Sequence, residues 1–260
     1  MLLAIDIGNT NVKMVVFNDS KLRSSWRLAT ETQRMPDEYQ MALANLLPLG
    51  GLAPSDVDAV VMCSVVPPLT AVFTEVCQDL LHIRPLVVGA GVRTGIRVVY
   101  DDPRSVGADR IVDAAAAYHL YPGPVIVVDC GTATVFDGVT ANGEFVGGAI
   151  APGLRSAADA LLSATSQLRR VEFTAPASAI GRNNIQAIQS GLVFSHVDMI
   201  EGMVRRFKRE LGDEAKVVAT GGFSGLMGSI TTVFDKVNTE LTLDGLRWIY
   251  ELNKPLESGK

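Results

Sequence analysis

Long hydrophobic runs and dense clusters of positive charge are both missing from this sequence. Its longest apolar stretches, such as residues 59–63 and 125–128, are far too short to span a bilayer. Asp6 interrupts the apolar N-terminal run and no basic segment precedes it, so we expect neither a secretion signal nor a membrane anchor. The net charge is −5, and the densest basic stretch, residues 205–209, belongs to a predicted amphipathic helix. We therefore expect neither nucleic acid nor a membrane as a partner.

Cysteine and histidine are scarce, with three residues of each. The cysteines (Cys63, Cys77 and Cys130) follow no metal-ligand spacing and cannot all pair. The histidines are scattered along the chain, so neither a metal cluster nor a histidine-based catalytic triad is indicated. Buried thiols of this kind are ordinary in a reducing compartment, and we expect a cytoplasmic protein.

The composition does supply a large hydrophobic core. Of 260 residues, 48% are hydrophobic and 20% charged, which favours one large or two modest folded domains. Apolar segments bounded by turn residues predict strands at residues 2–6, 12–17, 22–28, 57–63, 86–88, 125–129, 134–139, 145–150 and 217–219. Helical spacing predicts helices at residues 37–47, 67–81, 105–121, 154–165, 184–211 and 243–253.

The two halves of the chain resemble each other. The segments LAIDIGNTNVKMVVFNDSK (residues 3–21) and IVVDCGTATVFDGVTANGE (residues 126–144) align at an offset of 123 residues, which places Asp6 on Asp129 and Gly8 on Gly131. In each segment a strand ends in Asp, a Gly turn with Thr follows, and a second strand and a hairpin come next. We interpret this as an internal duplication of two lobes, and a cleft between such lobes is a usual ligand site.

The two Gly turns have the chemistry of a phosphate site. Glycine lets backbone N–H groups approach a ligand closely, and hydroxyl or amide side chains together with Lys13 add further donors. Two opposed carboxylates, Asp6 and Asp129, would repel each other unless a cation lies near them, as a divalent ion that carries phosphates would. The alternative is a pair of hairpins whose Asp residues bond only their own turns. Neither a P-loop nor a G-x-G-x-x-G motif is present.

Six motifs in order identify a resemblance. Strand-Asp-Gly-Thr in both halves resembles the superfamily of acetate and sugar kinases, Hsp70 and actin, whose two ribonuclease-H-like lobes clamp ATP. Over nearly its whole length the sequence further resembles type III pantothenate kinase. The matching strings are DIGNTNVK (residues 6–13), YDDPRSVGADR (100–110), DCGTATVFD (129–137), GGAIAPG (147–153), IGRNNIQAIQSG (180–191) and ATGG (219–222).

This resemblance implies a fold, a reaction and its cofactors. The expected fold is α/β, with two duplicated ribonuclease-H-like lobes of the actin-like ATPase fold, each a mixed five-stranded sheet flanked by helices. The lobes would be residues 1–117 and 118–260, with the last helix able to pack back on the first lobe. The expected activity is ATP-dependent phosphorylation of pantothenate to 4'-phosphopantothenate, the first step of coenzyme A synthesis. The family works as a cytoplasmic homodimer with Mg²⁺ and a monovalent cation, K⁺ or NH₄⁺.

The resemblance also assigns roles to residues. The first phosphate motif implies ATP binding by Asp6, Ile7, Gly8, Asn9, Thr10, Asn11, Val12 and Lys13, with Thr132 as the second phosphate contact. Asp6 would hold Mg²⁺ through water, and Asp129 would be the ligand of the monovalent cation. Asp109 would be the proton acceptor, which matches the need for one carboxylate near the attacking hydroxyl. Pantothenate would contact Tyr100, Gly107, Ala108, Asp109, Arg110 and Asn184.

Several alternatives stay open. Asp109 could serve only as a favourable charge at a helix N-terminus, and Arg110 as a surface ion pair. The family usually has Thr where Asn184 stands, which changes the geometry of that contact. Gly221 and Gly222 could admit adenosine or form a plain strand-to-helix turn. The whole chain could be a different small-molecule kinase or a nonenzymatic regulator on the same fold.

The segment 184–211 suggests a partner subunit. It carries more apolar residues than a narrow helical stripe needs, so either a second copy of the chain or its own lobe must cover them. These residues are Ile185, Ile188, Leu192, Val193, Val197, Ile200, Val204 and Phe207. In the dimer of the resembling family, Asn184 would complete the substrate pocket of the other protomer.

Overall fold

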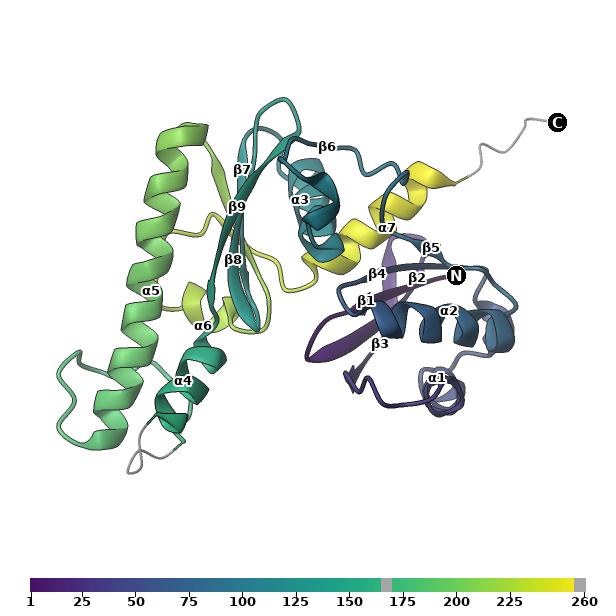
Figure 1. Cartoon of the computed structure of the whole chain (residues 1–260), viewed down its shortest axis with the longest axis horizontal. Helices are drawn as coiled ribbons and strands as arrows, with labels where there is room; N and C mark the ends of the chain where they lie inside the picture. Colours follow the sequence, from purple (N-terminus) through teal and green to yellow (C-terminus); the bar gives the residue numbers. More distant parts are fainter. Residues whose placement is uncertain (165–169, 255–260) are drawn as a thin grey trace. The chain divides into compact units, whose positions relative to one another are not determined.

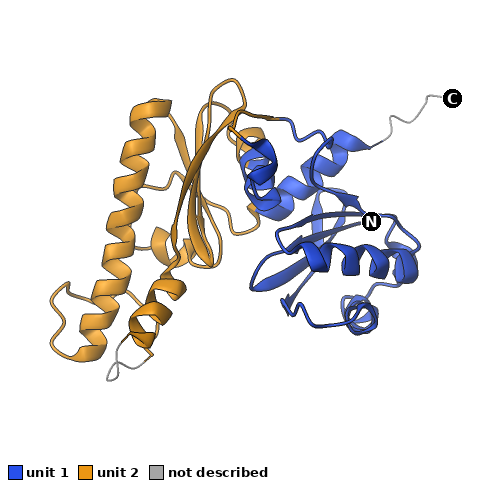
Figure 2. Cartoon of the chain, viewed as in Figure 1, with its two compact units in different colours: residues 1–95, 102–116, 242–260 blue, residues 96–101, 117–241 orange. Residues whose placement is uncertain are grey.

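The structure is a computed structural model, and it describes residues 1–164 and 170–254. The chain divides into two compact units, coloured separately in Figure 2. Unit 1 contains residues 1–95, 102–116 and 242–260, and unit 2 contains residues 96–101 and 117–241. The short segment 96–101 therefore belongs with the second half of the chain, whereas the last helix belongs with the first.

Unit 1 is built on a five-stranded mixed sheet with the order β3-β2-β1-β4-β5. Its first three strands form an antiparallel meander, and β4 and β5 continue the sheet in parallel with β1. The central strand β1 is buried on both faces, which explains why it is an apolar run without alternation. The strands are β1 (Leu2–Ile7), β2 (Asn11–Asn18), β3 (Lys21–Ala29), β4 (Ala59–Ser64) and β5 (Leu86–Val87).

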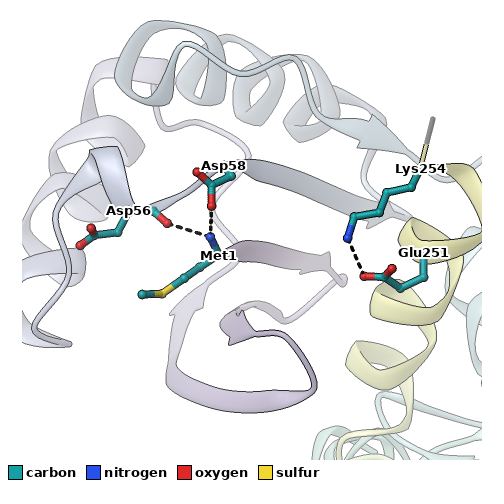
Figure 3. Close-up of polar contacts among 5 residues, drawn as sticks. All are labelled: Met1, Asp56, Asp58, Glu251 and Lys254. Carbon is teal, nitrogen blue, oxygen red and sulfur yellow. Dashed lines mark hydrogen bonds and ion pairs between the residues drawn. The ribbon is translucent and has the colours of Figure 1, made fainter. Parts of the chain in front are cut away.

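Helices α1 (Pro36–Leu49) and α2 (Pro67–Leu81) pack with this sheet (Figure 1). Proline at the first position suits both helix starts, because that N–H group has no partner inside a helix. One continuous core joins them to the sheet through residues such as Tyr39, Phe73 and Met62. A short 3₁₀ helix, Pro54–Asp56, leads into β4. The amino group of Met1 bonds the backbone oxygen of Asp56 at 2.9 Å and the carboxylate of Asp58, which ties the start of β1 to the start of β4 (Figure 3).

Unit 2 is built on a six-stranded sheet with the order β11-β10-β7-β8-β9-β6. The strands are β6 (Arg97–Val98), β7 (Val125–Cys130), β8 (Ala133–Val139), β9 (Glu144–Pro152), β10 (Lys216–Thr220) and β11 (Lys236–Val237). The prediction of two five-stranded sheets is therefore wrong for this unit. Strand β6 adds a sixth member by pairing in parallel with β9, and its two residues are too few to give a periodic signal.

The duplication is visible in the two sheets. Reading β9-β8-β7-β10-β11 against β3-β2-β1-β4-β5 gives the same meander followed by two parallel strands. Strands β1 and β7 keep the offset of 123 residues at both ends, as do β3 and β9. The sheet topology therefore confirms that the two sequence segments fold as one repeated motif.

In unit 2 the long helix α5 (Asn184–Leu211) lies along the sheet, and α4 (Leu154–Ser163) and α6 (Ser224–Gly228) lie near its lower end in Figure 1. Most of the apolar face of α5 is used within its own unit. Val193, Ile200 and Val204 are fully buried against β7, β8 and β10 in a common core. Ile185 is the exception, with 57% of its surface exposed. The predicted excess of apolar surface is thus confined to the first turn of α5.

The remaining helices differ slightly from prediction. Helix α3 (Ala108–Leu120) begins later than residue 105, because Pro103–Ser105 forms a separate 3₁₀ helix capped by the Asp102 side chain. Helix α7 (Leu241–Asn253) packs against α3 at Gly245, where a Cβ would lie 2.6 Å from the Val112 oxygen. Of the helix predicted at residues 154–165, residue 165 lies outside the described residues. Among the described residues, no helix is both long and apolar enough to cross a bilayer.

Candidate active site

The first Gly turn connects β1 to β2 and is held by the end of β3. The N–H of Gly8 donates to the Asn11 oxygen at 3.0 Å, which closes the turn. The Thr30 hydroxyl donates to the Gly8 oxygen at 2.6 Å, and the Thr30 N–H donates to the Thr10 oxygen at 3.0 Å. The backbone is fixed in this way while the side chains of Asn9, Thr10 and Asn11 stay exposed. A fixed turn with exposed donors is suited to phosphate oxygens.

Asp6 stands at the end of β1, where its neighbours across the sheet are Lys13 on β2 and Cys63 on β4. The pKa of Asp6 is raised from 3.8 to about 6, mainly because the carboxyl group is buried. The Asp109 carboxylate also raises this pKa, whereas the hydrogen bond from Cys63 and the charge of Lys13 lower it. Although part of the Asp6 surface still meets solvent, the surrounding protein desolvates the carboxyl group. An anion kept in such surroundings is costly, and a bound cation would offset that cost.

Asp109 belongs to the first turn of α3 and lies close enough to Asp6 for the two carboxylates to repel. Burial raises the pKa of Asp109, and the Arg110 backbone N–H, which donates to Oδ1 at 2.8 Å, and the Arg110 guanidinium oppose that shift. A Cβ at Gly107 would lie only 2.5 Å from Oδ1, so glycine makes room for the carboxylate. Asp113, one helical turn later, is buried as well. Unit 1 therefore gathers Asp6, Asp109 and Asp113 around the end of β4, since all three influence Cys63.

The second Gly turn connects β7 to β8 and is supported by the start of α4. The Gly131 N–H donates to the Ala133 oxygen at 3.0 Å, as Gly8 does in the first turn. The Ser156 hydroxyl donates to the Thr132 oxygen at 2.7 Å. A Cβ at Gly153 would overlap that same oxygen and lie 2.5 Å from the Gly131 oxygen. Gly153 and Ser156 therefore let α4 begin directly on the turn, and the Thr132 side chain stays exposed.

Asp129 is the next-to-last residue of β7, and two glycines approach its carboxylate closely. Atoms Oδ1 and Oδ2 would lie 3.3 and 3.4 Å from a Cβ at Gly131. A Cβ at Gly221, which follows β10, would overlap Oδ1 and lie 2.7 Å from the Cys130 carbonyl carbon. Gly221 also has φ +86°, a conformation that favours glycine. The carboxylate thus lies against the backbone of the glycines that follow β7 and β10.

Tyr100 and Asn184 are both placed in unit 2. The Tyr100 ring packs on Phe145 with centroids 6.3 Å apart, and Gly147 has no side chain where a Cβ would lie 3.0 Å from that ring. Asn184 is exposed at the first turn of α5, whose cap is Asn183 accepting from the Gln186 N–H at 2.9 Å. Asn184 lines a groove of about 470 Å³ between α4 and α5, whose other walls are mostly apolar.

The structure brings together Asp6, Lys13 and Asp109 in unit 1, and Asp129, Thr132 and the Gly221 turn in unit 2. Among the described residues, no group of three His, Cys, Asp or Glu side chains could hold a metal ion by itself. Sequence reasoning missed the supporting residues Cys63, Ser156 and His196. His196 on α5 shares a hydrogen bond of 2.8 Å with Thr134 of β8, and both side chains are buried. Of this buried pair, only Thr134 has a local sequence signal, because it closely follows the second Gly turn.

The topology defines the fold class. A Thermus thermophilus ROK hexokinase matches 96% of this chain and 99% of its own with a TM-score of 0.52 at 11% identity. A Campylobacter jejuni protein described as a conserved candidate Baf family transcriptional activator matches 98% and 100% with a TM-score of 0.63 at 18% identity. At these identities the likeness shows the fold alone. The chain has the α/β fold of the actin-like ATPases and sugar kinases, with two mixed sheets flanked by helices.

The sequence comparisons define the family. The family model described as type III pantothenate kinase matches residues 2–206. A type III pantothenate kinase of Dehalococcoides mccartyi is 49% identical over 97% of this chain and 96% of its own length. The type III pantothenate kinase of a Roseiflexus species is 47% identical over 98% and 100%. The chain belongs to the type III pantothenate kinase family, as the six sequence motifs predict.

Proposed function

We propose that this chain transfers the γ-phosphoryl group of ATP to pantothenate, giving 4'-phosphopantothenate in the first step of coenzyme A synthesis. The observation that carries the proposal is the 49% identity over nearly the full length of both chains to a type III pantothenate kinase. The residues of the two Gly turns are chemically suited to binding the phosphates of ATP. No observation favours a nonenzymatic regulator, and the carboxylates Asp6, Asp109 and Asp129 are all in place.

The first Gly turn would bind the β- and γ-phosphates. The turn amides, the Thr10 hydroxyl and the Lys13 ammonium would supply the donors, and the Thr30 bonds keep the turn in one conformation. The Thr132 hydroxyl of the second turn would be the other phosphate contact, because Ser156 and Gly153 hold its backbone. Preorganised donors of this kind stabilise charge that moves during phosphoryl transfer.

Asp6 would hold Mg²⁺ through water. A single carboxylate fits this role, because Mg²⁺ usually keeps several waters and takes its remaining ligands from the substrate phosphates. The desolvated Asp6 carboxyl, with its pKa raised to about 6, gains from a nearby cation. When bound, the ion neutralises charge on the phosphate oxygens. Asp129 would in the same way hold K⁺ or NH₄⁺, beside the backbone of Gly131 and Gly221.

Asp109 would accept the proton of the attacking pantothenate hydroxyl. Burial raises its pKa, and a base whose pKa approaches the working pH is the more effective catalyst. The Arg110 guanidinium would pair with the pantothenate carboxylate or with a phosphate oxygen. Gly107, Ala108 and Tyr100 would complete the pantothenate contacts. Glycine is suited to position 107 because it leaves room for the Asp109 carboxylate.

The active form would be a homodimer in which Asn184 contacts the pantothenate of the other protomer. Asn184 and Ile185 stand exposed beside an apolar groove, which a second copy would cover. Residues 1–117 and 118–260 would be the two ribonuclease-H-like lobes, with the last helix packing back on the first lobe. The three cysteines are buried and unpaired with one another, as expected for a reducing cytoplasm.

The test is turnover by the purified chain. With ATP, Mg²⁺ and K⁺, we expect ADP to form only when pantothenate is added, and the product to carry one phosphate by mass spectrometry. A panel of other small alcohols and sugars distinguishes a different kinase on the same fold. Replacing K⁺ by Na⁺ at constant Mg²⁺ should lower the rate. Phosphorylation of another acceptor in preference to pantothenate contradicts the proposed substrate, and equal rates in both salts contradict the cation site.

A further inference from the structure

Cys63 lies where the first candidate site meets the core of unit 1. It is the residue of β4 that stands opposite Asp6 of β1 in a parallel register. None of its surface is exposed, and its Sγ atom lies 3.5 Å from Oδ1 of Asp6. Parallel register places the two side chains on the same face of the sheet. The contact therefore follows from strand pairing across 57 residues of sequence.

The thiol is the donor in this contact. Burial raises the pKa of Cys63 well above 9, and the carboxylates of Asp6, Asp109 and Asp113 raise it further. The Sγ–H group donates to Oδ1 of Asp6, so its acceptor is a carboxylate oxygen. Thiols are weak donors in general, but a charged acceptor strengthens the bond.

The end of β4 contacts both segments that carry the carboxylates. The N–H of Val65 donates to the Ile7 oxygen at 3.1 Å, which anchors the residue after Asp6. The Val65 side chain lies 3.5 Å from where a Cβ at Gly107 would stand, two residues before Asp109. Residues 63–65 thus form one wall shared by the first Gly turn and the start of α3.

We propose that Cys63 is a positioning residue for Asp6: its thiol fixes the orientation of the carboxylate that receives the Mg²⁺–nucleotide complex. This inference rests on the proposed function. The second sheet has a matching arrangement, because Asp129 at the end of β7 stands opposite the buried hydroxyl residue Thr220 of β10. In both repeats, a residue able to donate from its side chain stands opposite the carboxylate on the neighbouring parallel strand.

The plain alternative is that Cys63 is a small core residue. Cys77 on α2 is such a residue: it is fully buried in the apolar core of unit 1, and burial alone raises its pKa to about 12. Cys77→Ala therefore serves as a matched control, with the same chemical change at the same burial but away from the carboxylates. A structural role would move the melting temperature in both variants and leave Mg²⁺ affinity unchanged.

The experiment compares Cys63→Ser, which keeps a donor, with Cys63→Ala and Cys63→Val, which lack one. Two quantities are measured: the Mg²⁺ concentration that half-saturates turnover, and calorimetric binding of a nonhydrolysable ATP analogue as Mg²⁺ is varied. We expect Ala and Val to require about five to ten times more Mg²⁺ in both assays, the effect of one weak bond to a charged group. Cys63→Ser should stay within about twofold of the parent chain, since its hydroxyl also donates. Cys77→Ala should not shift.

Each result decides the question. Unchanged Mg²⁺ dependence in Cys63→Val, no rescue by Cys63→Ser, or an equal shift in Cys77→Ala overturns the proposal. If Cys63→Ala fails to fold, the Ser and Val pair carries the comparison. If the parent chain binds the analogue but does not phosphorylate pantothenate, the proposed substrate fails while the calorimetric assay still tests Cys63. A parent chain that binds no Mg²⁺–nucleotide complex overturns both.

Discussion

Gly221 and Asp129 approach so closely that a Cβ on Gly221 would overlap Oδ1 of the carboxylate. Gly221 follows Thr220, which is the parallel neighbour of Asp129 in the ladder between β7 and β10. Gly222, by contrast, has no atom within 4 Å of where its Cβ would stand. Two adjacent glycines therefore differ completely in what a methyl group would meet, which makes them a natural pair for testing the proposed cation site.

We expect Gly221→Ala to displace the Asp129 carboxylate and to raise the K⁺ concentration needed for half-maximal activity by about tenfold or more. The φ of +86° adds backbone strain of about 1 kcal/mol or more, so the melting temperature should also fall. Gly222→Ala is the control and should leave the K⁺ dependence near that of the parent chain. Titrating activity with K⁺ at constant Mg²⁺ makes the measurement. Equal K⁺ dependence in the two variants contradicts a role for Gly221 in placing Asp129.

Asp109→Asn should lower kcat by about a hundredfold or more, because it removes the proposed proton acceptor while preserving shape. Circular dichroism should show an unchanged fold, since the amide oxygen can still accept from the Arg110 N–H. Asp79→Asn, an exposed change on α2, is the matched control and should keep full activity. A kcat for Asp109→Asn near that of the parent chain would remove Asp109 from the mechanism.

His196 should make stability depend on pH. Burial lowers the pKa of His196 below its ordinary 6.5, so the unfolded chain takes up a proton on this ring before the folded chain does. Its contribution to the free energy of unfolding is therefore complete above pH 6.5, declines as pH falls, and levels off below the folded-state pKa.

The measurement is denaturant unfolding of the parent chain and of His196→Gln between pH 8 and 5. The difference between the two isolates His196, because the raised pKa values of Asp6 and Asp109 act in the opposite direction in both chains. We expect the advantage of the parent chain to shrink toward low pH. An advantage that stays constant or grows contradicts a lowered pKa of His196 in the folded chain.

Ile185→Lys should weaken the proposed homodimer and lower specific activity. Ile185 is 57% exposed and follows Asn184, which lines the groove, so a lysine there places charge on the exposed apolar surface of the first turn of α5. Leu49→Lys is the control, because Leu49 is an exposed apolar residue of α1 in unit 1 with 80% of its surface exposed. Sedimentation and activity are followed together on dilution. A parent chain that is fully active as a monomer would refute the dimer and remove Asn184 from the site.

The sequence by itself determined the repeated part of the fold. The apolar runs that end in Asp6 and Asp129, the Gly turns after them and the hairpin at Gly143 are local signals, and each lies in the strand or turn predicted for it. The six ordered motifs also determined the family. The candidate residues of these motifs lie in short consecutive stretches, so local patterns of strand and turn residues are enough to point to them.

Only the tertiary structure decided which distant residues support those motifs. The bond from Cys63 to Asp6 depends on the parallel pairing of β4 with β1, and the overlap of Gly221 with Asp129 depends on the pairing of β10 with β7. The sixth strand, β6, consists of two residues and exists only because β9 offers an edge to pair with. Most of the apolar face of α5 is buried against the sheet of its own unit, which the periodicity of the helix alone could not show. Contacts of this kind depend on register and packing between segments far apart in the chain, which no local pattern encodes.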